Sequence, residues 1–397
     1  MPLATSFRYV GSSARIYAGA DALAHLGREV ERAGARRPFV VSARSVARNT
    51  NLLERIREGL GERLAGVYDG VVTESPLPSV LEGVEKARQA QADLLIAVGG
   101  GSAVVTARAI TILLAEEGSI YDLCTQYPPG RPPISPRLSK PKVPNIVVLT
   151  TPTTAANRAG AAVLDPQKRH RLELYDPKTR PISIFLDAEA LLTASPSLFL
   201  HTSVTTFAGV VGALQLPNLN PFSHADLREA LDLCLTYMPL LRERPKDPAV
   251  RIHLASAALL SNRASDALAG GLGIVSALAH SLQVRFGVHQ GLASGVLLVP
   301  GMRFNRDVLA EGQARLAWAM GTPRNGDSDL QMAEKAAQQV ARFLESLGIP
   351  SRLRDLGIPQ DTLQLLAEDA LTDFFLYTNP RRVKDVEELV ALLREAW

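Results

Sequence analysis

Residues 94–102 read LLIAVGGGS, an apolar run that ends in three glycines and a serine. Such a run is typical of a strand buried in a parallel sheet, and the apolar spacing of residues 103–115 predicts a helix directly after it. A strand that leads through glycines into a helix offers backbone N–H groups and a helix N-terminus to a phosphate. An ordinary tight turn would use the same glycines. The stretch therefore indicates an α/β fold and favours a nucleotide site.

The rest of the first half also alternates strand patterns with helix patterns. Further strands are predicted at 38–41, 64–68, 144–150 and 182–187, and further helices at 52–60 and 80–91. Residues 127–142 are rich in proline and basic side chains, which predicts an irregular surface segment. The alternation predicts a parallel sheet covered by helices, with ligands beyond the carboxyl ends of its strands.

The second half has a different pattern, with long segments whose apolar residues recur at helical spacing. Helices are predicted at 227–241, 250–260, 274–284, 291–304, 329–347 and 386–397. The chain of 397 residues is longer than a single core normally supports. We therefore expect an α/β dinucleotide-binding domain over residues 1–194 and an all-helical domain over residues 195–397.

The amino-acid composition limits the classes of partner that the protein can be expected to bind. A hydrophobic content of 46% and a charged content of 21% are typical of folded soluble proteins. The net charge of +3, without a basic stripe, argues against a nucleic-acid partner. No apolar run approaches the ~20 residues that cross a bilayer, no secretory signal begins the chain, and two cysteines are too few for a disulfide framework. We expect a cytoplasmic protein that acts on a small molecule, with no membrane partner.

Residues 92–108 resemble the GGGSxxDxAK phosphate loop of the iron-containing alcohol dehydrogenase superfamily, which has a dehydroquinate synthase-like fold. Further stretches resemble that family in the same order: TPTT at 151–154, VHQG at 288–291, VPGMRFN at 299–305 and NPRRV at 379–383. The last of these, with residues 392–397, is most similar to the maleylacetate reductase branch. The resemblance implies an α/β domain followed by an all-α domain and NAD or NADP as the cofactor, and we expect a homodimer.

The same resemblance implies a metal site, and the ligands for it are mostly missing. In the family one aspartate and three histidines hold a divalent metal that polarises the carbonyl accepting hydride. Ala208 and Gly212 stand where the aspartate and the first histidine would be, and Ser276 replaces the next histidine. His289 matches the last ligand. One imidazole cannot build a site that needs about four ligands, so we expect no metal.

The nucleotide side also departs from the family. Val105 replaces the aspartate of the motif, and Arg108 replaces its lysine. Ala43 stands where an acid would bind the adenosine ribose, and the neighbouring Arg44 favours a 2′-phosphate. We therefore expect NADP to bind at least as tightly as NAD. The residues expected to bind the cofactor are Gly99, Gly100, Gly101, Ser102, Thr153, Thr154, Ser42 and Arg44.

Four side chains are candidates for catalysis. His280 is a proton donor near neutral pH or a satisfied core histidine. His289 is either a catalytic residue or a cap of the following helix. Arg108 and Arg158 either orient a polar or anionic substrate or belong to the solvated surface.

These observations predict a divergent, metal-independent NAD(P)H-linked reductase that resembles maleylacetate reductase and acts on a small unsaturated, keto or imine substrate. The alternative is a repurposed non-redox enzyme on the same scaffold, a cyclase, isomerase or lyase, for example in bacterial secondary metabolism. A non-catalytic binding homologue is a third hypothesis. Fold alone does not separate the three, because function belongs to the site.

Overall fold

The computed structural model describes residues 3–11, 13–128, 133–168, 170–266, 268 and 271–397. The chain folds as two compact units, each assembled from more than one stretch of sequence. Unit 1 contains Met1–Gly11, Leu200–Pro245 and Ser256–Trp397, and unit 2 contains Ser12–Phe199 and Lys246–Ala255. The predicted domain boundary after residue 194 stays a prediction.

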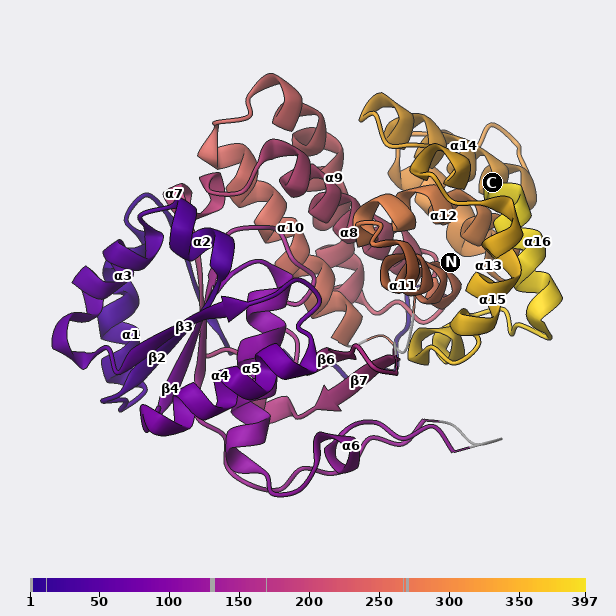
Figure 1. Ribbon diagram of the computed structural model, residues 1–397. Helices are drawn as coiled ribbons and strands as arrows, with labels where there is room; N and C mark the ends of the chain where they lie inside the picture. The colour runs from indigo at the N-terminus through magenta and orange to yellow at the C-terminus, as the bar shows by residue number, and fades with distance from the viewer. Residues whose placement is uncertain (1–2, 12, 129–132, 169, 267, 269–270) are drawn as a thin grey trace. The chain divides into compact units, whose positions relative to one another are not determined.

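Unit 2 is built on a six-stranded sheet in the order β1-β8-β5-β4-β2-β3, and every neighbouring pair is parallel. Figure 1 labels β2, β3 and β4 of this sheet. Its strands are β1 (Arg15–Gly19), β2 (Pro38–Ala43), β3 (Gly66–Val71), β4 (Leu94–Gly99), β5 (Asn145–Leu149) and β8 (Ser183–Asp187). β4, β5 and β8 are buried at every residue, and β2 at all but its last. Continuous burial explains the unbroken apolar runs of these strands and confirms the predicted parallel sheet.

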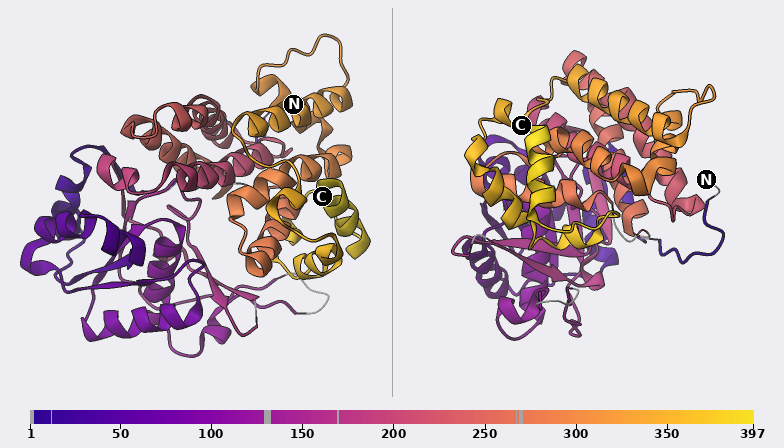
Figure 2. Two further views of the ribbon diagram at one scale, coloured as in Figure 1. Left: turned by 45° about the horizontal axis from the view of Figure 1, so that its top comes forward. Right: turned by 90° about the vertical axis from the view of Figure 1, so that its right-hand side faces the viewer.

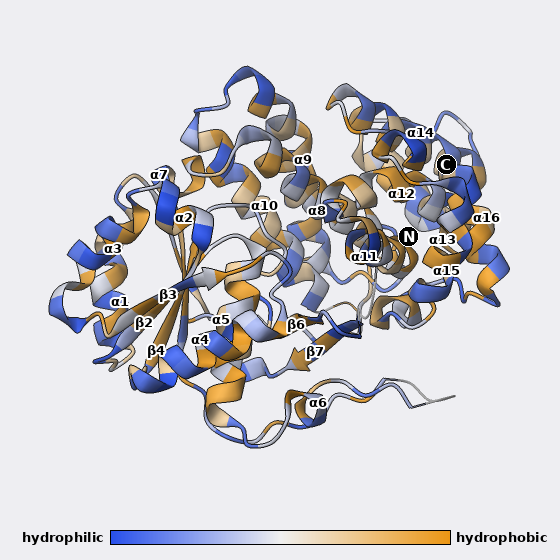
Figure 3. Cartoon of the chain, viewed as in Figure 1, coloured by the Kyte–Doolittle hydropathy of each residue, from blue (hydrophilic) through white to orange (hydrophobic). Residues whose placement is uncertain are grey.

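Helices cover this sheet. They are α1 (Leu26–Arg32), α2 (Arg44–Asn49), α3 (Leu52–Leu60), α4 (Leu77–Gln89), α5 (Gly101–Ala115), α6 (Ile120–Leu123) and α7 (Ala188–Leu192). α3 buries Leu52, Leu53, Ile56 and Leu60, which fall on one helical face, against β2, β4 and their neighbours. Figure 3 shows the result: β2 and β4 are coloured hydrophobic, whereas α3 and α4 carry both hydrophobic and hydrophilic residues.

A two-stranded antiparallel hairpin, β6 (Gly160–Asp165) and β7 (His170–Tyr175), completes unit 2. β6 alternates between buried and half-buried residues. Small alanines give this alternation little apolar contrast, so the sequence did not predict a strand here. The Leu164 N–H donates to the Ser75 carbonyl at 3.2 Å, which attaches the hairpin to the loop after β3.

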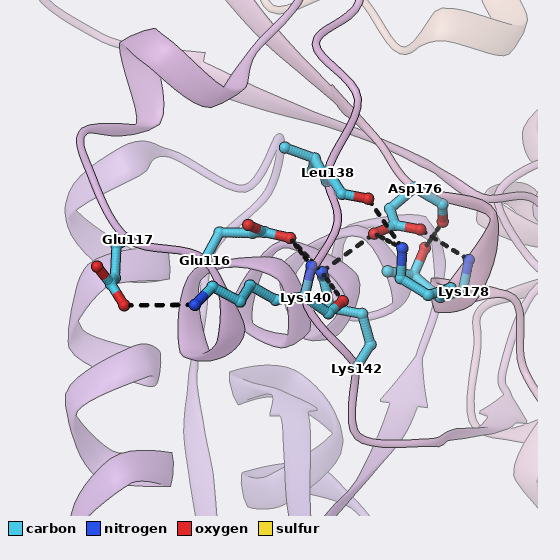
Figure 4. Close-up of polar contacts among 8 residues, drawn as sticks. Glu116, Glu117, Leu138, Lys140, Lys142, Asp176 and Lys178 are labelled. Carbon is cyan, nitrogen blue, oxygen red and sulfur yellow. Dashed lines mark hydrogen bonds and ion pairs between the residues drawn. The ribbon is translucent and has the colours of Figure 1, made fainter.

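The described residues between α6 and β5 contain no helix or strand, and most of them are exposed or half-buried, as predicted, but the end of the segment is anchored inside unit 2 (Figure 4). The Lys142 side chain is completely buried, with Nζ 2.6 Å from Glu116 Oε1 and 3.1 Å from Asp176 Oδ2. Burial alone would raise the pKa of both carboxyls, but hydrogen bonds from Lys142 and from neighbouring groups outweigh it and lower each pKa. The segment is therefore a surface loop whose end is anchored through a buried ion cluster, a feature that the sequence did not predict.

Every regular element described from residue 200 onward is helical, which confirms the predicted all-helical half (rose through orange to yellow in Figures 1 and 2). The helices are α8 (Pro196–Leu214), α9 (Pro221–Glu243), α10 (Pro248–Asp266), α11 (Gly273–Phe286), α12 (Gln290–Phe304), α13 (Arg306–Ala319), α14 (Asp329–Ser346), α15 (Leu363–Ala370) and α16 (Val386–Ala396). The sequence did not predict α8, α13 or α15.

α8 is long and apolar enough, by length and composition alone, to cross a membrane. The sequence expectation that no segment approaches this length was wrong for α8. However, 67% of its apolar window is buried inside the structure. A helix that is apolar on most sides and buried within protein is a core helix.

Both cysteines are buried free thiols. Burial raises the pKa of Cys234 to about 12. Burial, with a contribution from Glu173, also raises the pKa of Cys124.

Candidate functional site

The glycine turn of unit 2 lies where the carboxyl ends of β2, β4 and β5 meet. β4 ends at Gly99, whose φ of +145° is a conformation that L side chains rarely adopt. A Cβ on Gly99 would lie 3.4 Å from the Cβ of Ala43, at the end of β2. The Thr150 N–H, just after β5, donates to the Gly99 carbonyl at 3.0 Å. The turn thus requires glycine at position 99.

The next two glycines allow the loop after β5 to approach closely. A Cβ on Gly100 would lie 2.8 Å from Thr151 Oγ1, and one on Gly101 would lie 2.9 Å from Thr153 Oγ1. Gly100 precedes α5 and has no side chain to cap it, and the first turn of α5 contains no acidic residue. The positive end of the helix is therefore kept for an anion. This arrangement suits the diphosphate of a dinucleotide.

The other residues expected to bind the cofactor fall into two groups. Ser102 and the buried Thr153 lie at the turn. The Ser102 hydroxyl accepts a hydrogen bond from the Glu74 N–H, and the Thr153 hydroxyl accepts one from the Ala155 N–H, at 3.1 Å each. Thr154 is half-buried in the same loop as Thr153. Ser42 is fully buried in β2 and donates to its neighbour's carbonyl at 3.2 Å, which argues for a structural role. Arg44 is exposed at the start of α2.

Arg108 lies on α5 with 2% of its surface exposed. Its Nη1 donates to the Gly160 carbonyl at 2.6 Å, and its Nη2 to the Ala155 carbonyl at 2.8 Å. This geometry ties α5 to β6 and to the loop after β5. It argues for a structural tether instead of the substrate-orienting role expected from the sequence. Arg158, in the same loop, is half-buried, and its role stays a prediction.

In unit 1, His280 lies on α11 and is 7% exposed. Its Nδ1 is 2.8 Å from Asp373 Oδ2, and its Nε2 is 3.3 Å from the amide nitrogen of Gln290. Because the amide nitrogen donates to Nε2, the proton of the neutral ring lies on Nδ1 and is donated to Asp373. The second oxygen of Asp373 accepts the Phe375 N–H at 2.8 Å, which fixes the carboxylate. A histidine oriented by a carboxylate is an arrangement for acid–base catalysis.

Asp373 was missed at the sequence level, although it lies shortly before the NPRRV motif. The structure shows what that motif does. Asn379 accepts the N–H of Ile274, at the start of α11, at 3.2 Å and donates to Asn305 of the VPGMRFN motif at 2.9 Å. A Cβ on Gly273 would lie only 2.0 Å from the Phe375 carbonyl oxygen. The two motifs therefore hold α11 against the segment that carries Asp373.

His289 is the residue before α12, and its Nδ1 accepts the Gly291 N–H at 3.0 Å. Burial, helped by the neighbouring His201, lowers the pKa of His289 to about 4. The ring is therefore neutral at pH 7 and caps the helix. This is the structural alternative to the catalytic role, and the structure does not bring His289 into the hydrogen-bonded set of His280.

The residues of unit 1 do not fit the metal that the family resemblance implies. Ala208 and Gly212, both on α8, offer no ligating atom. A Cβ on Gly212 would lie 3.1 Å from the Leu272 nitrogen and 3.3 Å from its Cγ, so an imidazole has no room there without displacement. Within the described ranges, no group of three or more His, Cys, Asp or Glu side chains could hold a metal ion.

Two family models together match almost the full length of the chain. The family described as iron-containing alcohol dehydrogenase matches residues 13–188, and its C-terminal family matches residues 199–397. The NAD-dependent methanol dehydrogenase of Bacillus methanolicus is 26% identical over 383 residues, which cover 95% of this chain and 97% of that one.

Solved structures are similar in fold. A 1,3-propanediol oxidoreductase has a TM-score of 0.87 at 24% identity, with 99% of this chain and 100% of that chain covered. The maleylacetate reductase of Rhizobium sp. strain MTP-10005 has a TM-score of 0.79 at 23% identity, with 99% of each chain covered. The chain belongs to the iron-containing alcohol dehydrogenase family of NAD(P)-linked oxidoreductases.

Proposed function

We propose that the protein is a metal-independent NAD(P)H-linked reductase of a small unsaturated, keto or imine substrate. The observation that carries the proposal is the His280–Asp373 pair, together with a donor set that does not fit a metal. Family membership supports hydride chemistry. The NPRRV tail, which resembles that of maleylacetate reductases, supports a reductase of that branch.

The chain's own residues then have defined roles. The glycine turn binds the diphosphate of the cofactor, which supplies a hydride to the substrate when bound. Nε2 of His280 takes up a proton and releases it to the reduced product, and Asp373 stabilises the imidazolium in between. Without a Lewis acid, an acceptor that is already polarised, such as an iminium or an enone, suits these residues better than a plain ketone.

A non-redox acid–base enzyme is the second candidate. It is favoured by Val105, which leaves the first turns of α5 without the carboxylate of the family motif. The His280–Asp373 pair would serve proton transfer equally well in a cyclase, isomerase or lyase.

We also propose a cytoplasmic homodimer that acts on a small molecule, with neither nucleic acid nor membrane as a partner. The small net charge of +3 supports the exclusion of nucleic acid. Light scattering of the purified protein checks the oligomeric state.

The test of the reductase combines binding, turnover and metal content. The protein purified in EDTA is titrated with NADH and NADPH by calorimetry, and oxidation of the bound cofactor is followed with enone, iminium and ketone substrates. We expect NADPH to bind at least as tightly as NADH and turnover to be unchanged by EDTA. About one metal per chain, removed by a chelator with loss of activity, would show metal dependence. Absence of binding at millimolar cofactor would exclude the reductase and favour the non-redox enzyme.

A further inference from the structure

The loop between β3 and α4 has an unusual backbone next to the glycine turn. Glu74 and Ser75 have φ values of +66° and +52°, in the left-handed region that side chains avoid. Among the described residues other than glycine, Gln91 alone shares this feature. Strained backbone persists where its surroundings enforce it, and it concentrates at functional sites.

Hydrogen bonds fix this loop on the first turn of α5. The Glu74 N–H donates to Ser102 Oγ at 3.1 Å, and the Ser75 hydroxyl donates to the Ser102 carbonyl at 3.0 Å. Thr106 Oγ1 in turn donates to the Ser75 hydroxyl at 3.0 Å. The strained loop therefore holds Glu74 directly beside the end of the glycine turn.

The Glu74 carboxyl is half-buried, and no hydrogen bond or ion pair to it is found within the described part of the chain. Burial raises the pKa of Glu74, and the charge of Arg171 on β7 opposes that rise. A half-buried carboxyl without a hydrogen-bond donor is an acceptor ready for a ligand.

The position of this acceptor identifies the ligand group. In dinucleotide-binding folds, carboxylates accept hydrogen bonds from the hydroxyl groups of ribose. Ala43, at the end of β2, lies against Gly99 and supplies no carboxylate, whereas Glu74 lies at Ser102, at the other end of the turn. We propose that Glu74 binds a hydroxyl of the nicotinamide ribose, while the end of β2 lies beside the adenosine half. This inference rests on the proposed binding of a dinucleotide at the glycine turn.

The backbone strain makes a sharp test possible. Glu74→Gly removes the carboxyl and also relieves the strain, because glycine adopts positive φ freely. Glu74→Gln keeps the size and the strain but replaces the charged acceptor with a weaker one. Gln91→Gly is the matched control, since it relieves the same kind of strain in an exposed loop between α4 and β4.

The measurements are dissociation constants for NADH, NADPH and ADP, with the melting temperature of each variant. We expect Glu74→Gly to weaken NADH and NADPH about tenfold, the loss of one hydrogen bond to a charged group, without lowering the melting temperature. Glu74→Gln weakens both in the same direction. ADP, which lacks the nicotinamide half, binds all variants equally, and Gln91→Gly binds all three ligands as the wild type does.

Two results would overturn the inference while leaving the proposed function intact. One is unchanged NADH binding by Glu74→Gly. The other is a parallel loss of ADP affinity, which would place Glu74 at the adenosine half or show that the loop has collapsed. If the wild type binds none of the three ligands, the proposed function fails and this inference fails with it.

Discussion

His280 is bonded through both ring nitrogens to side chains, whereas Nδ1 of His289 accepts a main-chain N–H. The Asp373 carboxylate stabilises the charged form of His280. The pKa of His289, about 4, instead reflects burial and the nearby His201. Two histidines of adjacent helices are thus given different chemistry by their contacts.

We predict that His280→Ala lowers turnover about a hundred- to ten-thousand-fold while the melting temperature stays within a few degrees. Asp373→Asn should lower turnover less and shift the pH profile of turnover, because it keeps the shape of the side chain but not its charge.

His289→Ala should cost about 1 kcal/mol of stability through the lost cap, with a smaller effect on turnover. Steady-state kinetics and thermal melts check these outcomes. Full activity of His280→Ala would contradict the mechanism.

The same substitution at position 289 has a pH signature. The pKa of His289 is about 4 in the folded protein and 6.5 without perturbation, so the unfolded chain binds the proton more readily. Its contribution to stability is present above pH 6.5 and is lost as the pH falls towards 4. The melting temperature of His289→Ala should therefore fall less steeply over this range than that of the wild type.

At the scale of an element, α5 has one function at its first turn and another at its middle. Its first turn and the glycines before it are shaped for an anion. About two turns after Gly101, Arg108 uses two N–H groups to hold main-chain carbonyls of the loop after β5 and of β6. The buried guanidinium therefore fixes the loop that carries Thr153.

We predict that Arg108→Leu destabilises the protein by about 2–4 kcal/mol, because two partly buried carbonyls lose their donors. A substrate-orienting arginine would behave differently: KM would rise while stability stayed constant. Denaturant unfolding together with KM distinguishes the two roles. Arg108→Lys should recover only part of the stability, since one ammonium group replaces the planar fork.

Features that depend on neighbouring residues could be predicted from the sequence, whereas features that depend on contacts between distant residues could not. β4 and α3 were predicted almost to the residue, because continuous burial and one-sided burial each leave a local pattern. The His280–Asp373 pair joins residues 93 positions apart, and no local pattern marks the aspartate. The left-handed backbone at Glu74 depends on α5 and β6, so it was equally invisible in the sequence.

At the scale of the whole molecule, the buried ion cluster of Figure 4 connects three segments of unit 2: the end of α5, the irregular segment before β5 and the turn after β7. Lys142 holds two buried carboxylates in their charged form. The exposed Lys140, by contrast, lies 3.7 Å from the exposed Glu117. A buried pair is costly to break, whereas an exposed pair contributes little.

We predict that Lys142→Met destabilises the protein by about 3–5 kcal/mol, because two carboxylates lose their buried cation. Lys140→Met, the control, should change stability by less than about 0.5 kcal/mol. The pKa values of Glu116 and Asp176 are lowered on folding, so their stabilisation is present above their unfolded pKa and is lost on acidification. Lys142→Met leaves Asp176 with Lys178 and Glu116 with the Lys140 N–H. The effect of burial on the two pKa values is then opposed less strongly, and acid unfolding should begin at higher pH. Melting temperatures measured across pH test this, and identical profiles for the two variants would contradict it.

The burial of both thiols has a practical consequence for labelling. Only a thiolate reacts readily with maleimide, and a pKa of about 12 keeps Cys234 protonated at neutral pH, while Cys124 is buried with a raised pKa. A cysteine introduced at Lys140 of unit 2 and another at the exposed Leu330 of unit 1 would therefore be labelled selectively. Energy transfer between dyes at these two positions would report directly whether a bound dinucleotide changes the separation of the units.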